Sequence, residues 1–294
     1  MPAESGPPPG GIASSSEPAG TLTVGPADPA GAARPAFVVA RILLVLFIVA
    51  AIQIVAGAVL VLAWPGADVF SGDIPAGLLV SAAAVTSITF LAAGLLLGAG
   101  GVVFRSTGGP APAILAVVTF IALSKVVDGV LNLTGWGDSG ILVQMARSLG
   151  ESRGMTLALA VLFIGVGAGV GEETFFRGWM QGRLRGIWGP RPAIVATAAA
   201  FGLMHLDPVQ GTVAFLMGIL LGWVVERTGS VIPAIAAHAV SNTLSVLLLA
   251  FAGGRGSHGI HVGLILAGLL IGAWGIRRLG RIGHAPAGGA RPGS

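Results

Sequence analysis

Three ionisable side chains stand together in an apolar part of the chain: Glu172, Glu173 and Arg177. The preceding residues, Leu157 to Val170, are all apolar or small. If this stretch forms one helix, the glutamates lie about 20 to 25 Å along it, within or near the hydrocarbon of a bilayer. Charged groups at that depth cost at least a few kcal/mol each, so we expect them to face the protein interior or a water-filled cavity.

The spacing of these three residues predicts different roles for them. Glu173 and Arg177 are four residues apart with the acid first, which is the favourable order for an ion pair on a helix. Glu172 lies about 100° around the helix and stays unpaired. A carboxylate bound to a cation is a poor base, so Glu172 is the better candidate for a general base. The alternative is a purely structural pair of acids.

Two histidines within apolar segments add further polar groups. His205 ends the segment that begins near Pro192, and it can share an attacking water molecule with Glu172. His238 and Asn242 are four residues apart, so both project from one face of a helix. Two neighbouring hydrogen-bond donors of this kind can hold a developing oxyanion. Each histidine alone is more typical of a hydrogen-bonded core residue.

The order of these residues resembles the CPBP intramembrane protease family, which includes CAAX-processing and bacteriocin-immunity proteases. The resemblance covers about residues 155–252. Three motifs carry it: Glu172-Glu173-x-x-x-Arg177, Phe201-x-x-x-His205 and His238-x-x-x-Asn242.

This resemblance implies an all-helical endopeptidase that acts at or within the membrane. Glu172 and His205 would activate water, while His238 and Asn242 would stabilise the tetrahedral oxyanion. Two further positions carry over as supporting residues, Glu173 and Arg177. The implied substrate is a peptide or protein, and a prenylated C-terminus, a lipopeptide and a signal-peptide remnant are all open as substrate classes.

A metal ion is the open chemical question, because this family has also been classed among metalloproteases. The sequence lacks the His-Glu-x-x-His spacing that places two ligands and a base on one helical face. Glu172, His205 and His238 would form a three-ligand zinc site if their helices converge. We prefer a metal-free glutamate mechanism that needs no cofactor.

Composition identifies the chain as an integral membrane protein. Of its 294 residues, 54% are hydrophobic and 10% are charged, whereas a soluble domain carries roughly 25% charged residues. The basic residues gather at the ends of apolar runs, which argues against a nucleic-acid partner. The absence of cysteine excludes a thiolate nucleophile and thiolate metal ligands.

The predicted fold is an all-α, polytopic transmembrane bundle of about eight spans over residues 36–280, with a protease core at about 155–252. A Pro/Gly/Ala-rich N-terminal tail (1–35) and a C-terminal tail (281–294) are predicted to be disordered. The expected helices cover about 42–64, 75–104, 112–136, 155–184, 192–205, 207–225, 231–252 and 260–276.

Local patterns predict several details of this bundle. Lys125 and Asp128 are three residues apart and favour a structural ion pair. Asp207 before Pro208 reads as a helix N-cap, which makes the fifth and sixth helices a tight hairpin. The polar stretch 137–154 favours a short interfacial helix. Excess arginine in alternate loops and after the last span places both termini in the cytoplasm, at the cell membrane.

The depths of two candidate residues conflict in this scheme. Glu172 falls toward the cytoplasmic half of its span, while His205 falls about 20 Å up a helix that starts at the cytoplasmic side. A shared site then needs a fifth helix that starts late or a strongly tilted fourth helix.

Two functions outside catalysis also fit the sequence. The same polar cluster can bind a peptide, lipid or partner without turnover, as in an immunity or scaffold protein. A proton-coupled transporter is less favoured, because the inverted repeat with broken helices that it would show is not visible.

Overall fold

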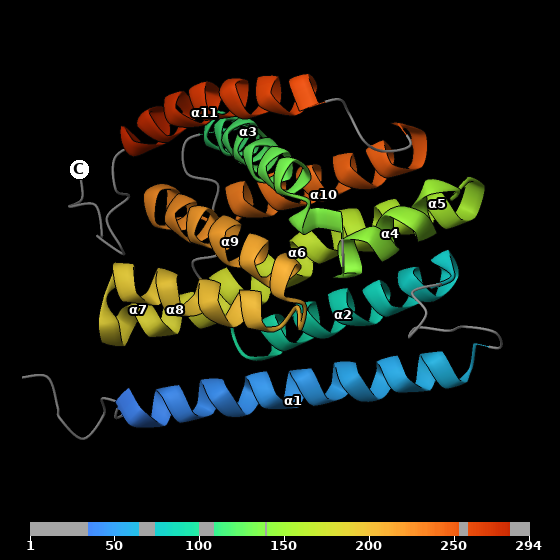
Figure 1. The fold of residues 1–294 in the computed structure, drawn as a ribbon. Helices are drawn as coiled ribbons and strands as arrows, with labels where there is room; N and C mark the ends of the chain where they lie inside the picture. The colour runs from blue at the N-terminus through green and yellow to red at the C-terminus, as the bar shows by residue number, and fades with distance from the viewer. Residues whose placement is uncertain (1–34, 65–73, 100–108, 139, 253–257, 283–294) are drawn as a thin grey trace, which may run out of the picture. The chain divides into compact units, whose positions relative to one another are not determined.

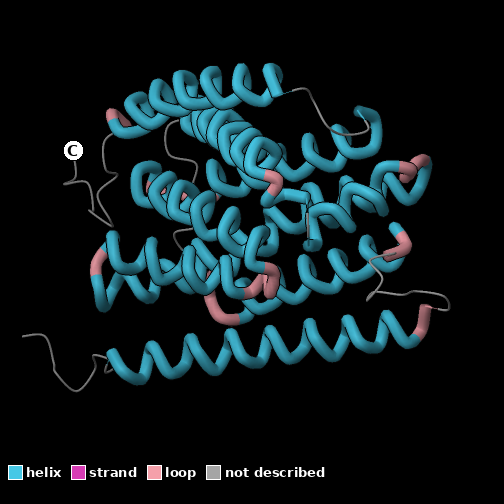
Figure 2. The backbone as a smooth tube through the Cα atoms, in the orientation of Figure 1, coloured by secondary structure: helices cyan, strands magenta, loops and turns pink. Residues whose placement is uncertain are grey.

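The computed structural model describes residues 35–64, 74–99, 109–138, 140–252 and 258–282. All regular structure in these residues is helical (Figure 2), so the predicted all-α membrane fold is confirmed. Almost all of the two predicted tails lies outside the described residues. Part of the second expected helix, 100–104, lies outside them as well.

The order of elements follows the sequence prediction closely. The helices before the site-bearing span are α1 (Pro35–Leu62), α2 (Ala76–Leu96), α3 (Ala111–Thr134), the short 3-10 turn η1 (Trp136–Asp138) and α4 (Gly140–Gly150). The next span contains α5 (Gly154–Ala160), η2 (Val161–Gly167), α6 (Ala168–Glu173), η3 (Thr174–Gln181) and α7 (Gly182–Trp188). The last helices are α8 (Pro190–Leu203), α9 (Pro208–Thr228), α10 (Ile232–Ala252) and α11 (His258–Gly280).

The described residues contain seven helices that are long and apolar enough to cross a membrane, whereas we expected about eight spans. The difference is α8, which has 14 residues. At ~1.5 Å per residue it extends for about 21 Å, less than the ~30 Å of a bilayer core. The fifth expected helix therefore exists as a short element that pairs with α9.

The site-bearing span, Gly154–Trp188, runs unbroken for 35 residues and is longer than the expected 155–184. Within it, η2 and η3 are π-helical and flank the short α6 on both sides. Such segments are rare and are frequent at functional sites. Two carbonyls of η2 accept side-chain hydrogen bonds, that of Phe163 from Ser87 Oγ (3.0 Å) and that of Ile164 from Asn242 Nδ2 (3.3 Å).

A sharp turn at Gly189 resolves the expected conflict of depth. Gly189 has φ 80°, a value that glycine adopts without steric cost, and Pro190 starts α8 directly after it. Helices α7 and α8 then pack as a hairpin. Because the preceding span continues to Trp188, Glu172 precedes the turn by about as many residues as His205 follows it. The two residues therefore lie at a similar distance from the hairpin turn.

Helix α6 lies in the middle of the bundle, between α2 on one side and α10 on the other (Figure 1). An aromatic cluster follows it, in which the rings of Phe90, Phe175, Phe176 and Phe201 pack with centroids 5.0 to 5.2 Å apart. All four are buried. Ring pairs at this spacing add to the packing energy beyond area burial, so the cluster fixes η3 against α2 and α8.

Local predictions for the surrounding helices are confirmed. The side chains of Lys125 and Asp128 form an ion pair. Asp207 caps α9, since its Oδ1 accepts a hydrogen bond from Gln210 N at 2.8 Å. Its Oδ2 also accepts one from Ile141 N at 3.3 Å, which ties the start of α4, the predicted short helix, to the start of α9.

Glycines on α6 allow its backbone to approach α10 and α2 closely, as expected if they serve packing rather than a hinge. A Cβ placed on Gly169 would lie 2.6 Å from the backbone nitrogen of Ala239 on α10. One placed on Gly171 would collide with the carbonyl of Ser87 on α2. Small residues at such crossings replace the hydrophobic effect, which does not drive helix association in lipid.

Gly169→Ala should therefore destabilise the protein by about 1–3 kcal/mol, the usual cost of overpacking. Thermal unfolding in detergent, followed by size-exclusion chromatography, measures this loss. Gly182→Ala is the matched control in the same span, because its Cβ would meet nothing within 4 Å. Equal stability of the two variants would contradict the close packing of α6 on α10.

Candidate active site

The charged residues of α6 and η3 are almost fully buried. Glu172 is 8% exposed, Glu173 0% and Arg177 2%. The predicted ion pair is confirmed: Arg177 Nη1 donates to Glu173 Oε1 at 2.8 Å. Arg177 Nη2 also donates to the carbonyl of Gly218 on α9 at 3.1 Å, and the guanidinium lies 4.6 Å from the ring centroid of Phe201. Arg177 is thus held from three sides.

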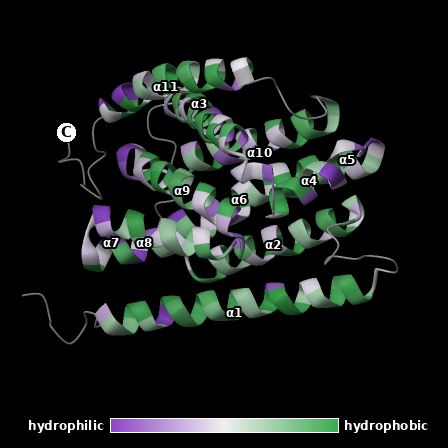
Figure 3. Cartoon of the chain, viewed as in Figure 1, coloured by the Kyte–Doolittle hydropathy of each residue, from purple (hydrophilic) through white to green (hydrophobic). Residues whose placement is uncertain are grey.

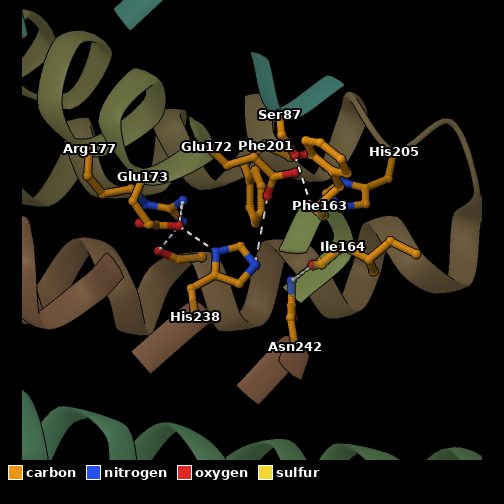
Figure 4. Close-up of polar contacts among 11 residues, drawn as sticks. Ser87, Phe163, Ile164, Glu172, Glu173, Arg177, Phe201, His205, His238 and Asn242 are labelled. Atoms are coloured by element: carbon orange, nitrogen blue, oxygen red, sulfur yellow. Dashed lines mark hydrogen bonds and ion pairs between the residues drawn. The ribbon is translucent and has the colours of Figure 1, made fainter. Parts of the chain in front are cut away.

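His238 of α10 lies between the two glutamates (Figure 4). Its Nδ1 is 2.8 Å from Glu173 Oε1, and its Nε2 is 3.8 Å from Glu172 Oε2. A carboxylate only accepts hydrogen bonds, so Nδ1 carries a proton and donates it to Glu173. Glu173 Oε1 therefore receives bonds from both Arg177 and His238. Sequence spacing contains no signal for the second bond, because its partners lie on different helices.

Glu172 is the less constrained of the two acids. Within the described residues its carboxylate makes no hydrogen bond, and its nearest ionisable partner is His238 at 3.8 Å. It also interacts electrostatically with His205. The division predicted from spacing, with one paired glutamate and one without an ion-pair partner of its own on the helix, therefore describes the geometry.

His205 lies in the turn that follows α8, not within the helix as expected. Its Nδ1 is 2.9 Å from the carbonyl of Phe201, which leaves Nε2 free to face the site. The Phe201 ring lies 5.0 Å from the ring of His205 and 6.0 Å from that of His238 and so separates the two imidazoles. The next residue, Leu206, has φ 55°, a strained value for a non-glycine residue.

Asn242 shares a face of α10 with His238, as predicted. Its Nδ2 is bonded to the Ile164 carbonyl in η2, which fixes the amide beside the π-helical segment. A primary amide has two N–H donors, so one remains for another partner. Figure 4 shows Asn242 one turn along α10 from His238.

The three side chains predicted as zinc ligands do not form a ligand set. Among the described residues, no group of three or more His, Asp or Glu side chains is arranged to hold a metal ion. His238 Nδ1 is engaged by Glu173, and the Phe201 ring separates His238 from His205. The residues as they lie therefore do not fit a metal centre built from Glu172, His205 and His238.

A row of polar side chains that sequence reasoning did not connect continues from the site along one helix face. It pairs Glu173, Arg177, Gln181 and Arg185, spaced four residues apart, with Gly218, Gly222 and Glu226, also spaced four apart on α9. We call these seven residues the polar ladder. The regular spacing of both sets is visible in the sequence and could have revealed it.

The outer rungs of the polar ladder are as short as the inner ones. Gln181 Nε2 donates to the carbonyl of Gly222 and to Glu226 Oε1, both at 3.0 Å. Arg185 Nε lies 2.9 Å from Glu226 Oε2, and its side chain is 46% exposed. The ladder thus runs from His238 in the interior to solvent-accessible Arg185.

Comparison with known families identifies a part of the chain that includes all the candidate site residues. Residues 154–244 match the model of a family described as type II CAAX prenyl endopeptidase, Rce1-like. This match confirms the resemblance to the CPBP family and supports an intramembrane endopeptidase of that type. Comparison with curated proteins and with solved structures gave no match.

Proposed function

We propose that this protein, whose residues 154–244 match Rce1-like CAAX prenyl endopeptidases, is an integral membrane endopeptidase that hydrolyses a peptide bond at or in the membrane. The observation that carries the proposal is the environment of Glu172. It is a buried carboxylate without a hydrogen bond among the described residues, and a histidine stands 3.8 Å away. Its neighbour Glu173 already takes up the nearby arginine.

The reaction uses Glu172 as the general base. Glu172 takes a proton from a water molecule that His205 helps to orient, and the water oxygen attacks the carbonyl carbon of the scissile bond. Hydrogen-bond donors from His238 and Asn242 stabilise the resulting oxyanion. When the tetrahedral intermediate collapses, the C–N bond breaks and the leaving amine takes the proton from Glu172. Glu173 and Arg177 support this arrangement.

The substrate is a peptide or protein with a lipid-modified segment, a class that follows from the name of the matched family. Large apolar side chains are exposed along α1 and α11, and Figure 3 shows hydrophobic residues around much of both helices. These faces are suited to lipid contact. In the proposed orientation both termini face the cytoplasm. The start of α1 and the end of α11 lie at the same end of the bundle (Figure 1).

Reconstitution in liposomes tests this function. Pairs of peptides that differ only in a C-terminal prenyl group are incubated with the protein, and their masses are followed. We expect shorter products from the prenylated member of each pair. Peptides that bind but keep their length would instead indicate a non-enzymatic binding protein. Peptidomics of host membranes would then identify the natural substrate.

Removal of metal ions is a separate test of the chemistry. On the glutamate mechanism, cleavage in liposomes should be unchanged after prolonged incubation with a strong chelator. Added zinc should not increase it. Loss of cleavage with the chelator, restored by zinc, would contradict the metal-free mechanism while leaving the peptidase assignment in place.

A further inference from the structure

The polar ladder begins at the candidate site and crosses an unusual backbone segment. Its Arg177 and Gln181 rungs belong to η3, which starts directly after Glu173. A π-helix has wider turns and is rare because an α-helix is normally the more stable alternative. Something must therefore hold η3 in its π-helical form.

The ladder can do this because its bonds depend on helix rotation. If η3 relaxed to an α-helix, residues on one side of it would turn relative to those on the other, by about 100° for each residue of register. Arg177 and Gln181 would then no longer reach the carbonyls of Gly218 and Gly222. Each of these bonds therefore favours the π-helical register.

The facing glycines belong to the same device. A Cβ on Gly218 would lie 3.0 Å from Arg177 Nη2, and one on Gly222 would lie 2.8 Å from Gln181 Oε1. Glycine at these positions lets long polar side chains reach the α9 backbone. In a bilayer, where lipid is as apolar as a helix surface, such interhelical hydrogen bonds help to define how helices meet.

We propose that the polar ladder holds η3 in its π-helical register and thereby orients Glu172 and Glu173 toward His238. Gln181 is then a positioning residue, eight residues beyond Glu173 and without contact with the reacting atoms. The consequence for cleavage rests on the proposed peptidase function, whereas the consequence for helix rotation does not. A displacement of about 1 Å at a reacting group can cost about 10²-fold in rate.

Substitutions at the Gln181–Glu226 rung test the proposal. Gln181→Glu removes both donated bonds and places two carboxylates together, so kcat should fall by about 10²-fold with little change in KM. The double variant Gln181→Glu with Glu226→Gln restores an amide–carboxylate pair and should recover much of the loss. A role in general stability alone would not produce this recovery in kcat.

Arg183→Met is the matched control, since Arg183 lies two residues away and also bonds another helix, through the carbonyl of Leu97 on α2 (2.9 Å). It lies outside the ladder. We expect its kcat to equal that of the wild type. A loss as large as that of Gln181→Glu would overturn the assignment of positioning to the ladder.

A second measurement works without any substrate. The chain has no cysteine, so spin labels can be attached at two introduced cysteines, in place of Gly186 on α7 and Leu216 on α9. Both positions are exposed. The label distance should shift in Gln181→Glu and return in the double variant. An unchanged distance would overturn the ladder proposal, whereas missing cleavage by the wild type would overturn only the peptidase function.

Discussion

Glu172→Gln should abolish cleavage while membrane insertion and folding stay intact. Loss of a general base usually costs about 10²–10⁴-fold in rate. Glu173 cannot substitute for it, because both Arg177 and His238 already donate to its Oε1. The amide of Gln has nearly the same shape as the carboxylate, so the packing around residue 172 is preserved. Product formation in liposomes measures the effect.

Asp128→Asn is the matched control for this experiment. It also replaces an acid by its amide within a span, but it removes the Lys125–Asp128 pair on α3, where Asp128 has a 47% exposed side chain. Its cleavage rate should equal that of the wild type. Full activity of Glu172→Gln would refute Glu172 as the base.

Arg177→Met should cause the largest loss of stability. It leaves Glu173, which is fully buried, without its cation, and removing one partner of a buried ion pair typically costs about 3–5 kcal/mol. The bond to the Gly218 carbonyl is lost at the same time. Thermal unfolding of the purified protein, together with its yield in membranes, measures this loss.

A second substitution separates charge from packing in this variant. Adding Glu173→Gln to Arg177→Met removes the unpaired buried charge and should recover part of the stability. Lys125→Met provides the comparison, because its half-exposed pair should contribute about 1 kcal/mol or less. Equal effects of Arg177→Met and Lys125→Met would show that the buried pair has no special weight.

The features that could be predicted from the sequence are those determined by neighbours in the chain. The Glu173–Arg177 pair, the Lys125–Asp128 pair and the Asp207 cap each involve residues within four positions, and helix geometry alone brings such residues together. Long apolar runs predicted the membrane helices for the same reason. The family resemblance added the link between Glu172, His205 and His238, which spacing could not provide.

Other features depend on contacts between helices and were not predictable in this way. The bond from His238 to Glu173 joins α10 to α6. The π-helical form of η3 is maintained by bonds to α9, while its sequence alone is compatible with an ordinary α-helix. The extension of the span to Trp188 changed the relative depth of Glu172 and His205, and no local pattern indicated it.

The shortness of α8 has a consequence for how the protein enters the membrane. A helix that ends partway through a bilayer leaves backbone carbonyls that lipid cannot satisfy. Here the turn satisfies two of them, since His205 N bonds to Gly202 O and Leu206 N to Leu203 O. We therefore expect α8 and α9 to leave the insertion machinery together, as a hairpin, so that His205 reaches its position during biogenesis and not by later rearrangement.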